Sequence, residues 1–260
     1  MIRFEIRDRV ALATIDRTER RNALNAELCD VLHDHLVGID IDAVGAIVIT
    51  GEGTAFCSGA DLGRRAADTG GDGGGIEHGG GDSFRPAFDR FLQTVVEHPL
   101  PVIAAVNGPA MGAGMQLAVA CDFRVVGPKA RFAIPAARLG VVLSAPNIAR
   151  LERLVGPGVA RDVLLAAATL DVDAADRAGL VHRRADDALA AALAWGDELA
   201  RLAPITVRGH KHALNLVARG LTPEAVVELR ALEERAFTSE DLQEGLAASS
   251  EKRDPEFRGR

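Results

Sequence analysis

Two glycine-containing loops are the segments of this sequence best suited to chemistry on a bound ligand. They are Cys57-Ser-Gly-Ala-Asp61 and Gly108-Pro-Ala-Met-Gly-Ala-Gly114, and each follows a predicted strand and precedes a predicted helix. The first N–H groups of a helix lack an intrahelical acceptor and lie at the positive end of the helix dipole. Either loop alone is more simply explained as a tight turn. Two such loops that converge on one carbonyl oxygen would form an oxyanion hole, which stabilises developing negative charge.

Gln116 lies in the helix that follows the second loop. Chemistry on the carbon atoms next to the ligand carbonyl would need an acid or a base at this place. A carboxylate could accept or donate a proton there, whereas a neutral amide cannot. The sequence therefore predicts a site that binds a carbonyl ligand but lacks a group that would transform it.

Four titratable residues are further candidates for that missing group. Asp61 and Asp122 are expected to hydrogen-bond to nearby backbone instead, Asp61 as a helix cap. Glu77 and His78 lie in the stretch 69–82, where eight of fourteen residues are glycine. Such a stretch buries little apolar surface, so it predicts a solvated, mobile loop rather than a lid that delivers a base.

The two loops need a scaffold, which the apolar periodicity and the turn residues of the chain predict. Strands alternating with helices, followed by a helical second half, predict an α/β core with an α-helical C-terminal part. Asn25 and Thr222 are suited to cap two of the helices. The predicted strands are two within 2–16, then 46–50, 102–106, 123–126, 131–134 and one near 180–183. The predicted helices are 26–38, 84–98, the one carrying Gln116, 144–154, 158–167, 186–202, 205–218, 223–237 and 240–250.

Composition excludes several classes of partner. The 260 residues are 48% hydrophobic, which is enough for a large core. A net charge of −7 with mixed signs argues against nucleic acid or an anionic membrane as the main partner. Cys29, Cys57 and Cys121 lack metal-ligand spacing and are expected to be buried thiols in a reducing compartment. With no signal-peptide pattern and no apolar run of the roughly 18–20 residues that span a membrane, we expect a cytoplasmic protein.

Five segments occur in an order and spacing typical of one family. They are Arg21-Asn-Ala-Leu-Asn25, Phe56-Cys-Ser-Gly-Ala-Asp-Leu62, Asn107-Gly-Pro-Ala-Met-Gly-Ala-Gly114, Cys121-Asp122 and Glu251-Lys-Arg253. Together they resemble the enoyl-CoA hydratase/isomerase (crotonase) superfamily across essentially the whole chain. The resemblance implies a ββα superhelix core, expected over 1–195, and a helical region, expected over 196–260, that builds trimers often paired into hexamers. It also implies an acyl-CoA thioester as the ligand and no permanently bound cofactor.

The resemblance assigns roles to individual residues. The oxyanion-hole donors would be the backbone N–H groups of Ala60 and Ala113. Lys252 matches a family cation near the CoA phosphates, so the helical tail would reach a CoA site on its own subunit or on a neighbour. The residues expected to contact the acyl-CoA are Arg21, Ala23, Ser58, Ala60, Asp61, Leu62, Gly112 and Lys252.

The sequence departs from the family at the positions of its catalytic carboxylates. Hydratases of this family use two glutamates to position and activate water for addition across the α,β double bond. Here the matching positions hold Gln116 and Ala136, and Ser144 stands where some isomerase relatives have an acid. Because general acid–base catalysis contributes roughly 10²–10⁴-fold in rate per group, we expect hydration to be slower by several orders of magnitude.

Two functions therefore remain open from the sequence. The first is a protein that binds fatty acyl-CoA in lipid metabolism without ordinary hydratase activity and delivers it to a partner. The second is an active enzyme of this family, a hydratase, isomerase or acyl-CoA hydrolase, that uses a different acid or base. A dinucleotide-binding domain is disfavoured, because no Gly-x-Gly-x-x-Gly turn follows the first strand.

Overall fold

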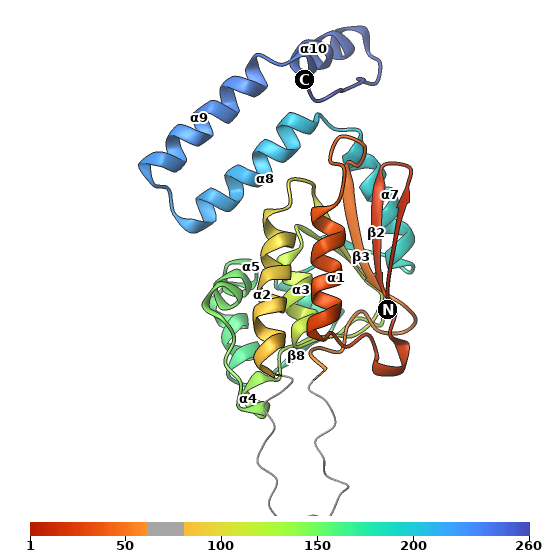
Figure 1. The fold of residues 1–260 in the computed structure, drawn as a ribbon, viewed down its shortest axis with the longest axis vertical. Helices are drawn as coiled ribbons and strands as arrows, with labels where there is room; N and C mark the ends of the chain where they lie inside the picture. Colours follow the sequence, from red (N-terminus) through yellow and green to blue (C-terminus); the bar gives the residue numbers. More distant parts are fainter. Residues whose placement is uncertain (62–80) are drawn as a thin grey trace, which may run out of the picture.

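The computed structural model describes residues 1–61 and 81–260, which form a six-stranded sheet of order β1-β2-β3-β4-β6-β9 and surrounding helices (Figure 1). Leu62, Glu77 and His78 lie outside the described residues. β1 and β2 are antiparallel, and the other neighbouring strands are parallel. The six strands are β1 (Ile2–Arg7), β2 (Val10–Ile15), β3 (Ala46–Gly51), β4 (Val102–Val106), β6 (Phe123–Val126) and β9 (Arg183–Arg184).

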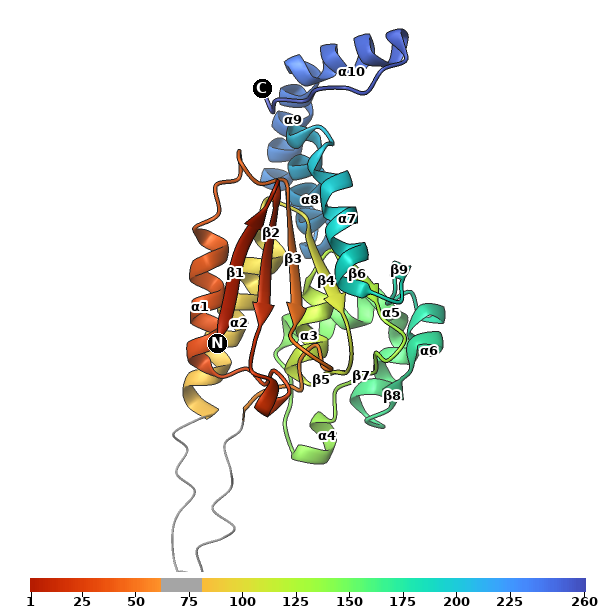
Figure 2. The same ribbon diagram turned by 90° about the vertical axis from the view of Figure 1, so that its right-hand side faces the viewer.

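The central strands are buried on both faces, as expected for parallel strands between layers of helices. Alternate residues of β2 point to opposite faces: Ala11 and Ala13 join one apolar cluster, and Val10 and Leu12 join another. Figure 2 shows α1 (Ala26–Val37) and α2 (Gly81–Glu97) on one side of the sheet and α7 (Ala188–Ala200) on the other. The side chain of Asn25 caps α1, because its Oδ1 accepts from the N–H of Leu28 at 2.9 Å.

A second, three-stranded sheet holds the glycine-rich segment that precedes α3. In it, β5 (Ala110–Met111) pairs parallel with β7 (Phe132–Ala133), and β7 pairs antiparallel with β8 (Thr169–Leu170). β5 and β8 were not predicted, because two residues are too few to show an apolar period.

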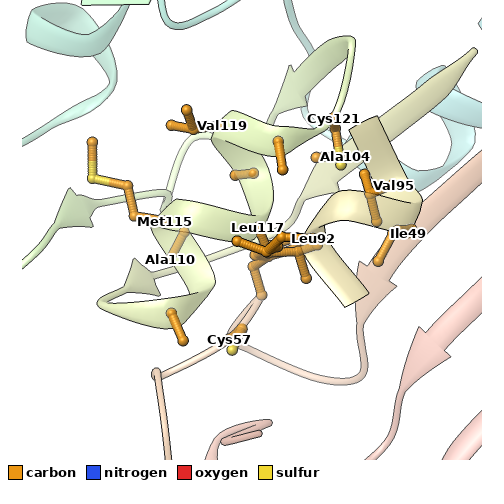
Figure 3. Packing of buried hydrophobic residues seen from close by; sticks show 14 of the residues in the cluster. Ile49, Cys57, Leu92, Val95, Ala104, Ala110, Met115, Leu117, Val119 and Cys121 are labelled. Carbon is orange, nitrogen blue, oxygen red and sulfur yellow. The ribbon is translucent and has the colours of Figure 1, made fainter. Parts of the chain in front are cut away.

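The short helix α3 (Ala113–Ala120) lies inside the molecule, and seven of its eight residues are buried. Figure 3 shows Leu117 of α3 against Leu92 of α2, in the cluster that also contains Ile49 of β3. Gln116 is the one residue of α3 that is not buried. The core therefore fixes the helix and leaves this side chain partly exposed.

The chain after α3 is mostly helical, as predicted. α5 (Ala145–Leu164) is bent at Gly156, whose φ of 76° and ψ of 162° are non-helical. The bend joins the two predicted helices 144–154 and 158–167 end to end. Two further short helices, α4 (Ala136–Leu139) and α6 (Val172–Arg177), were not predicted, because one or two turns give little periodic signal.

Three helices at the C-terminal end extend past the sheet in both views (Figures 1 and 2). They are α8 (Pro204–Arg219), α9 (Pro223–Phe237) and α10 (Glu240–Glu251). Thr222 caps α9 as predicted, since its Oγ1 accepts from the N–H of Ala225 at 3.2 Å. The predicted division between residues 195 and 196 falls within α7. Across the described ranges, no helix has both the length and the apolar character needed to cross a membrane.

A buried ammonium group fastens α8 to the core. Lys211 is only 8% exposed, and its Nζ donates to the carbonyl of Leu100 at 2.8 Å. It also pairs with Asp122, with 2.7 Å between Nζ and Oδ2. The same carboxylate oxygen accepts from the N–H of Val102 at 2.7 Å, so the predicted bond of Asp122 to the backbone is confirmed.

Candidate functional site

The first glycine-containing loop is held by parallel pairing between Leu24 and Ala60. The N–H of Leu24 donates to the carbonyl of Gly59 at 2.8 Å, and the N–H of Asp61 donates to the carbonyl of Leu24 at 2.6 Å. Consecutive residues of an extended chain direct their amides to opposite sides, so the N–H of Ala60 points away from Leu24. Within the described part of the chain, this N–H has no hydrogen-bond acceptor.

The second loop ends in one paired and one unpaired amide. The N–H of Gly112 donates to the carbonyl of Ala133 at 2.7 Å, which attaches the loop to β7. Ala113 is the first residue of α3, so its N–H has no acceptor within the helix. No other described residue accepts from it. Ala60 and Ala113 thus each present an unpaired backbone donor.

Glycine allows the two loops to touch. Gly59 has a φ of 114° and Gly112 a φ of 54°, in the region that favours glycine. A Cβ built on Gly59 would lie 3.1 Å from the carbonyl oxygen of Met111 and 3.7 Å from the nitrogen of Ala113. Ala60 follows Gly59 directly, so the unpaired donors of Ala60 and Ala113 lie on adjoining segments.

Gly114 forms a second close contact between the loops, since a Cβ added there would lie 2.3 Å from the carbonyl oxygen of Cys57. We expect Gly114→Ala to push the loops apart and to weaken acyl-CoA binding about tenfold or more. Titration calorimetry with octanoyl-CoA measures this loss. Gly158→Ala is the matched control, because a Cβ at Gly158 meets no atom within 4 Å. An equal loss of affinity in both variants would contradict this role for Gly114.

Two polar side chains that the loop motifs did not indicate hold the first loop in place. Asn22 is fully buried, and its Nδ2 donates to the carbonyls of Glu52 at 2.9 Å and Ala55 at 2.7 Å. Arg17 pairs with Asp61, with 2.7 Å between Nη1 and Oδ2. Asp61 thus anchors the loop, whereas the helix that it was predicted to cap would begin beyond the described residues.

The segment predicted to line the CoA path lies beside the first loop. The N–H of Ser58 donates to the carbonyl of Arg21 at 3.0 Å, and its Oγ donates to the carbonyl of Arg20 at 2.9 Å. Arg21 and Ser58 are exposed, and Ala23 is buried beneath them at 7% exposure. The structure therefore brings Arg21, Ala23 and Ser58 together with the loop of Ala60.

The three positions at which the resemblance predicts an acid lie at or near helix starts. The side chain of Gln116 turns back on the second loop, and its Nε2 donates to the carbonyl of Gly112 at 3.4 Å. Ala136 is the first residue of α4 and is 9% exposed. Ser144 directly precedes α5. None of these three residues carries a carboxylate.

Lys252 does not join the loops within one chain. It lies just after α10, with a left-handed φ of 55°, and its side chain is exposed. α10 lies at the opposite end of the molecule from α4 (Figures 1 and 2). A contact between Lys252 and a ligand at the loops would therefore have to come from another copy of the chain.

The cysteine next to the first donor is unsuited to nucleophilic chemistry. Cys57 is fully buried, and burial raises the pKa of its thiol to about 12. Because the thiolate is the reactive form, Cys57 is inert at neutral pH. Cys29 and Cys121 are also buried and free, which confirms the prediction of buried thiols.

The structure combines a mixed α/β core with a helical C-terminal region, and its two loops meet beside unpaired amides. These features define a class of proteins that can hold a carbonyl ligand through backbone N–H groups. The chain belongs to the enoyl-CoA hydratase/isomerase family, whose model matches residues 5–260. Its fold is accordingly the crotonase fold, as predicted. Proteins of this family act on acyl-CoA thioesters.

Named proteins of this family match this chain over all or nearly all of its length. The Mycobacterium tuberculosis protein named "Probable enoyl-CoA hydratase echA6" is 39% identical over 263 residues, with 100% of both chains covered. The 2,3-dehydroadipyl-CoA hydratase of Escherichia coli is 34% identical, covering 97% of this chain and 96% of its own. The crystal structure of an enoyl-CoA hydratase from Bacillus anthracis matches with a TM-score of 0.87 at 28% identity, covering 100% of this chain and 99% of its own.

Proposed function

We propose that this protein binds fatty acyl-CoA thioesters in cytoplasmic lipid metabolism and lacks ordinary hydratase activity. The observation that carries the proposal is the pair of unpaired N–H donors, at Ala60 and Ala113, on adjoining segments. Gln116 and Ala136 stand where the family's two glutamates are expected. The names of the relatives support the ligand class, since both names describe hydratases of CoA thioesters.

The proposed site polarises the thioester carbonyl but lacks the two groups that hydration needs. The two backbone N–H groups would donate hydrogen bonds to the carbonyl oxygen, and in mutational precedents one such donor is worth roughly 10²–10³ in rate. Hydration also needs a group that takes a proton from water and a group that returns one. The amide of Gln116 and the methyl of Ala136 can do neither. Binding is therefore retained, while addition of water is lost.

The rest of the ligand would lie along the first loop. Arg21 and Ser58 would line the path of CoA, together with Ala23, Asp61, Leu62 and Gly112. Lys252 would reach the CoA phosphates from a second copy of the chain, because α10 extends away from the loops of its own chain (Figure 1). Residues 1–195 would then form the binding core, and 196–260 would complete the site of a neighbour.

The assembly that supplies Lys252 would be a homotrimer, or a hexamer of two trimers. Large apolar side chains are exposed along the three C-terminal helices, which is typical of a surface that packs against another protein. They include Leu214, Val217, Val227, Phe237 and Leu246. Light scattering at micromolar concentration tests the assembly, and a monomer would contradict it.

Binding without hydration is a measurable combination. Calorimetry should show octanoyl-CoA binding to the purified protein. A spectrophotometric assay should show little hydration of crotonyl-CoA or of longer enoyl-CoAs by the same preparation. Turnover on the order of tens per second, a typical rate for enzymes, would contradict the loss of hydratase activity.

A second candidate is an enzyme of this family that uses a different base, for example an isomerase or an acyl-CoA hydrolase. One observation favours it, namely that the carboxylate of Asp89 lies within hydrogen-bond distance of Ser144. Ser144 is the third position discussed above, where the resemblance places an acid in some isomerase relatives. The carboxylate of Asp89, from α2, therefore lies next to position 144, where this chain has a serine instead of an acid.

A further inference from the structure

Asp89 of α2 lies at the start of α5, although the two segments are far apart in the sequence. Its Oδ1 accepts from the Oγ of Ser144 at 3.1 Å and from the Nδ2 of Asn147 at 3.2 Å. Ser144 is the residue before α5, and Asn147 lies in its first turn. Two donors from one helix start thus hold one oxygen of a carboxylate from another helix.

A buried amide and an arginine fix this arrangement. Asn147 is 6% exposed, and its Oδ1 accepts from the Nη1 of Arg150 at 2.6 Å. A guanidinium can only donate, so it sets the orientation of the amide and directs the NH₂ group of Asn147 towards Asp89. Burial lowers the pKa of Arg150, and the nearby charge of Asp89 acts in the opposite direction.

The second carboxylate oxygen is available for a proton. Both hydrogen bonds go to Oδ1, and no donor from the described residues contacts Oδ2. Asp89 is also exposed, so a proton that it accepts can be passed on to solvent. A carboxylate with one oxygen fixed and one free can act as a general base.

The location of Asp89 relates it to the two donor loops. Its neighbour Phe88 is buried in the same apolar cluster as Ala113 and Ala136. α3, whose first amide is one of the proposed donors, packs against both α2 and α5 (Figure 1). Asp89 therefore belongs to one of the two helices that pack against α3, and Ser144 directly precedes the other.

We propose that Asp89 is the base that removes an α-proton from the bound acyl-CoA, in place of the acids absent at residues 116, 136 and 144. This inference rests on the proposed binding of acyl-CoA. The α C–H bond breaks, the proton moves to Oδ2 of Asp89, and the electron pair forms the enolate, whose oxygen the amides of Ala60 and Ala113 hold. Return of a proton to the α-carbon regenerates the thioester. With a 3-enoyl-CoA, return to the γ-carbon gives the 2-enoyl-CoA.

Proton exchange isolates this step from any later reaction. The protein is incubated with octanoyl-CoA in D₂O, and mass spectrometry follows deuterium at the α-carbon. We expect exchange by the unaltered protein and a loss of roughly 10²–10⁴-fold in Asp89→Asn, since one general base contributes that much. Octanoyl-CoA affinity, measured by calorimetry, should stay the same. Glu152→Gln makes the same charge change at an exposed residue of α5 and should exchange normally.

Each other result overturns the proposal in a different way. Exchange by Asp89→Asn at the unaltered rate would show that another base acts. Exchange by the unaltered protein no faster than in a protein-free sample would show that no base acts. Failure of the unaltered protein to bind octanoyl-CoA would overturn the binding function together with this inference, whereas binding without exchange overturns the inference alone.

Discussion

The double substitution Gln116→Glu with Ala136→Glu is expected to raise the hydration of crotonyl-CoA by roughly 10²-fold or more, because general acids and bases contribute 10²–10⁴-fold in rate. The gain needs both groups, since one carboxylate activates water and the other returns a proton. Each single substitution should therefore give much less than the pair. Steady-state rates of the four proteins, with octanoyl-CoA affinity measured in parallel, test this expectation.

The structure favours tolerance of the two new side chains. Gln116 is already partly exposed and similar in shape to glutamate, and its bond to the carbonyl of Gly112 is long, at 3.4 Å. Ala136 begins a helix, where a negative charge is stabilised by the helix dipole. The matched control is Gln116→Glu with Ala136→Gln, which adds the same bulk at 136 without a carboxylate. A double variant no faster than this control would contradict the assignment of position 136.

Lowering the pH from 7 to 4 is expected to reduce the free energy of unfolding by about 3 kcal/mol through His98 alone. Burial lowers the pKa of His98 from 6.5 to about 4, and the charge of Lys211 acts in the same direction. His98 is 6% exposed, its Nδ1 accepts from the N–H of Leu100, and its Nε2 bonds to the carbonyl of Leu36. In the neutral ring the proton lies on Nε2, so Nε2 donates to Leu36 and Nδ1 accepts from Leu100. A second proton, on Nδ1, would leave the N–H of Leu100 without its acceptor.

Stability decreases with falling pH because the unfolded chain protonates His98 at a higher pH than the folded chain does. As the pH falls below 6.5, the unfolded chain protonates this histidine while the folded chain does not, so stability decreases until the pH reaches about 4. Above 6.5 the contribution is constant. Urea unfolding between pH 7 and 4, compared with His98→Gln, separates this effect from that of the carboxylates. Equal pH dependence in the two proteins would contradict the role of His98.

Local sequence signals predicted the parts of the fold that local interactions determine. Asn25 and Thr222 cap their helices because a side-chain oxygen needs only a partner three residues away. The largely apolar run 46–50 predicted a strand, and β3 is buried along its whole length. α6 and β8 escaped prediction because such short elements depend on contacts that the surrounding chain supplies.

The candidate site divides in the same way. The glycine loops were visible in the sequence, because a left-handed or crowded backbone position restricts the residue type. Two contacts were missed, namely the pairing of Arg17 with Asp61 and the hydrogen bond from Ser144 to Asp89. The sequence alone does not distinguish an aspartate with such a partner from one that faces solvent, because the partner is brought near only by the fold. The resemblance predicted a role for Lys252 in CoA binding, but only the three-dimensional arrangement shows that α10 extends away from the loops of its own chain (Figure 1).

The contact between the two glycine loops has a consequence for how this protein could diverge. The proposed ligand donors are main-chain amides of two alanines, and almost every residue type supplies an N–H. Capture of the thioester is therefore encoded in the path of the backbone, whereas turnover is encoded in a few replaceable side chains. Mutation can remove or relocate the proton-transfer group without dismantling the receptor. Proteins with this architecture can therefore lose catalysis and become ligand carriers, or replace one catalytic base with another, while they still bind the same ligand.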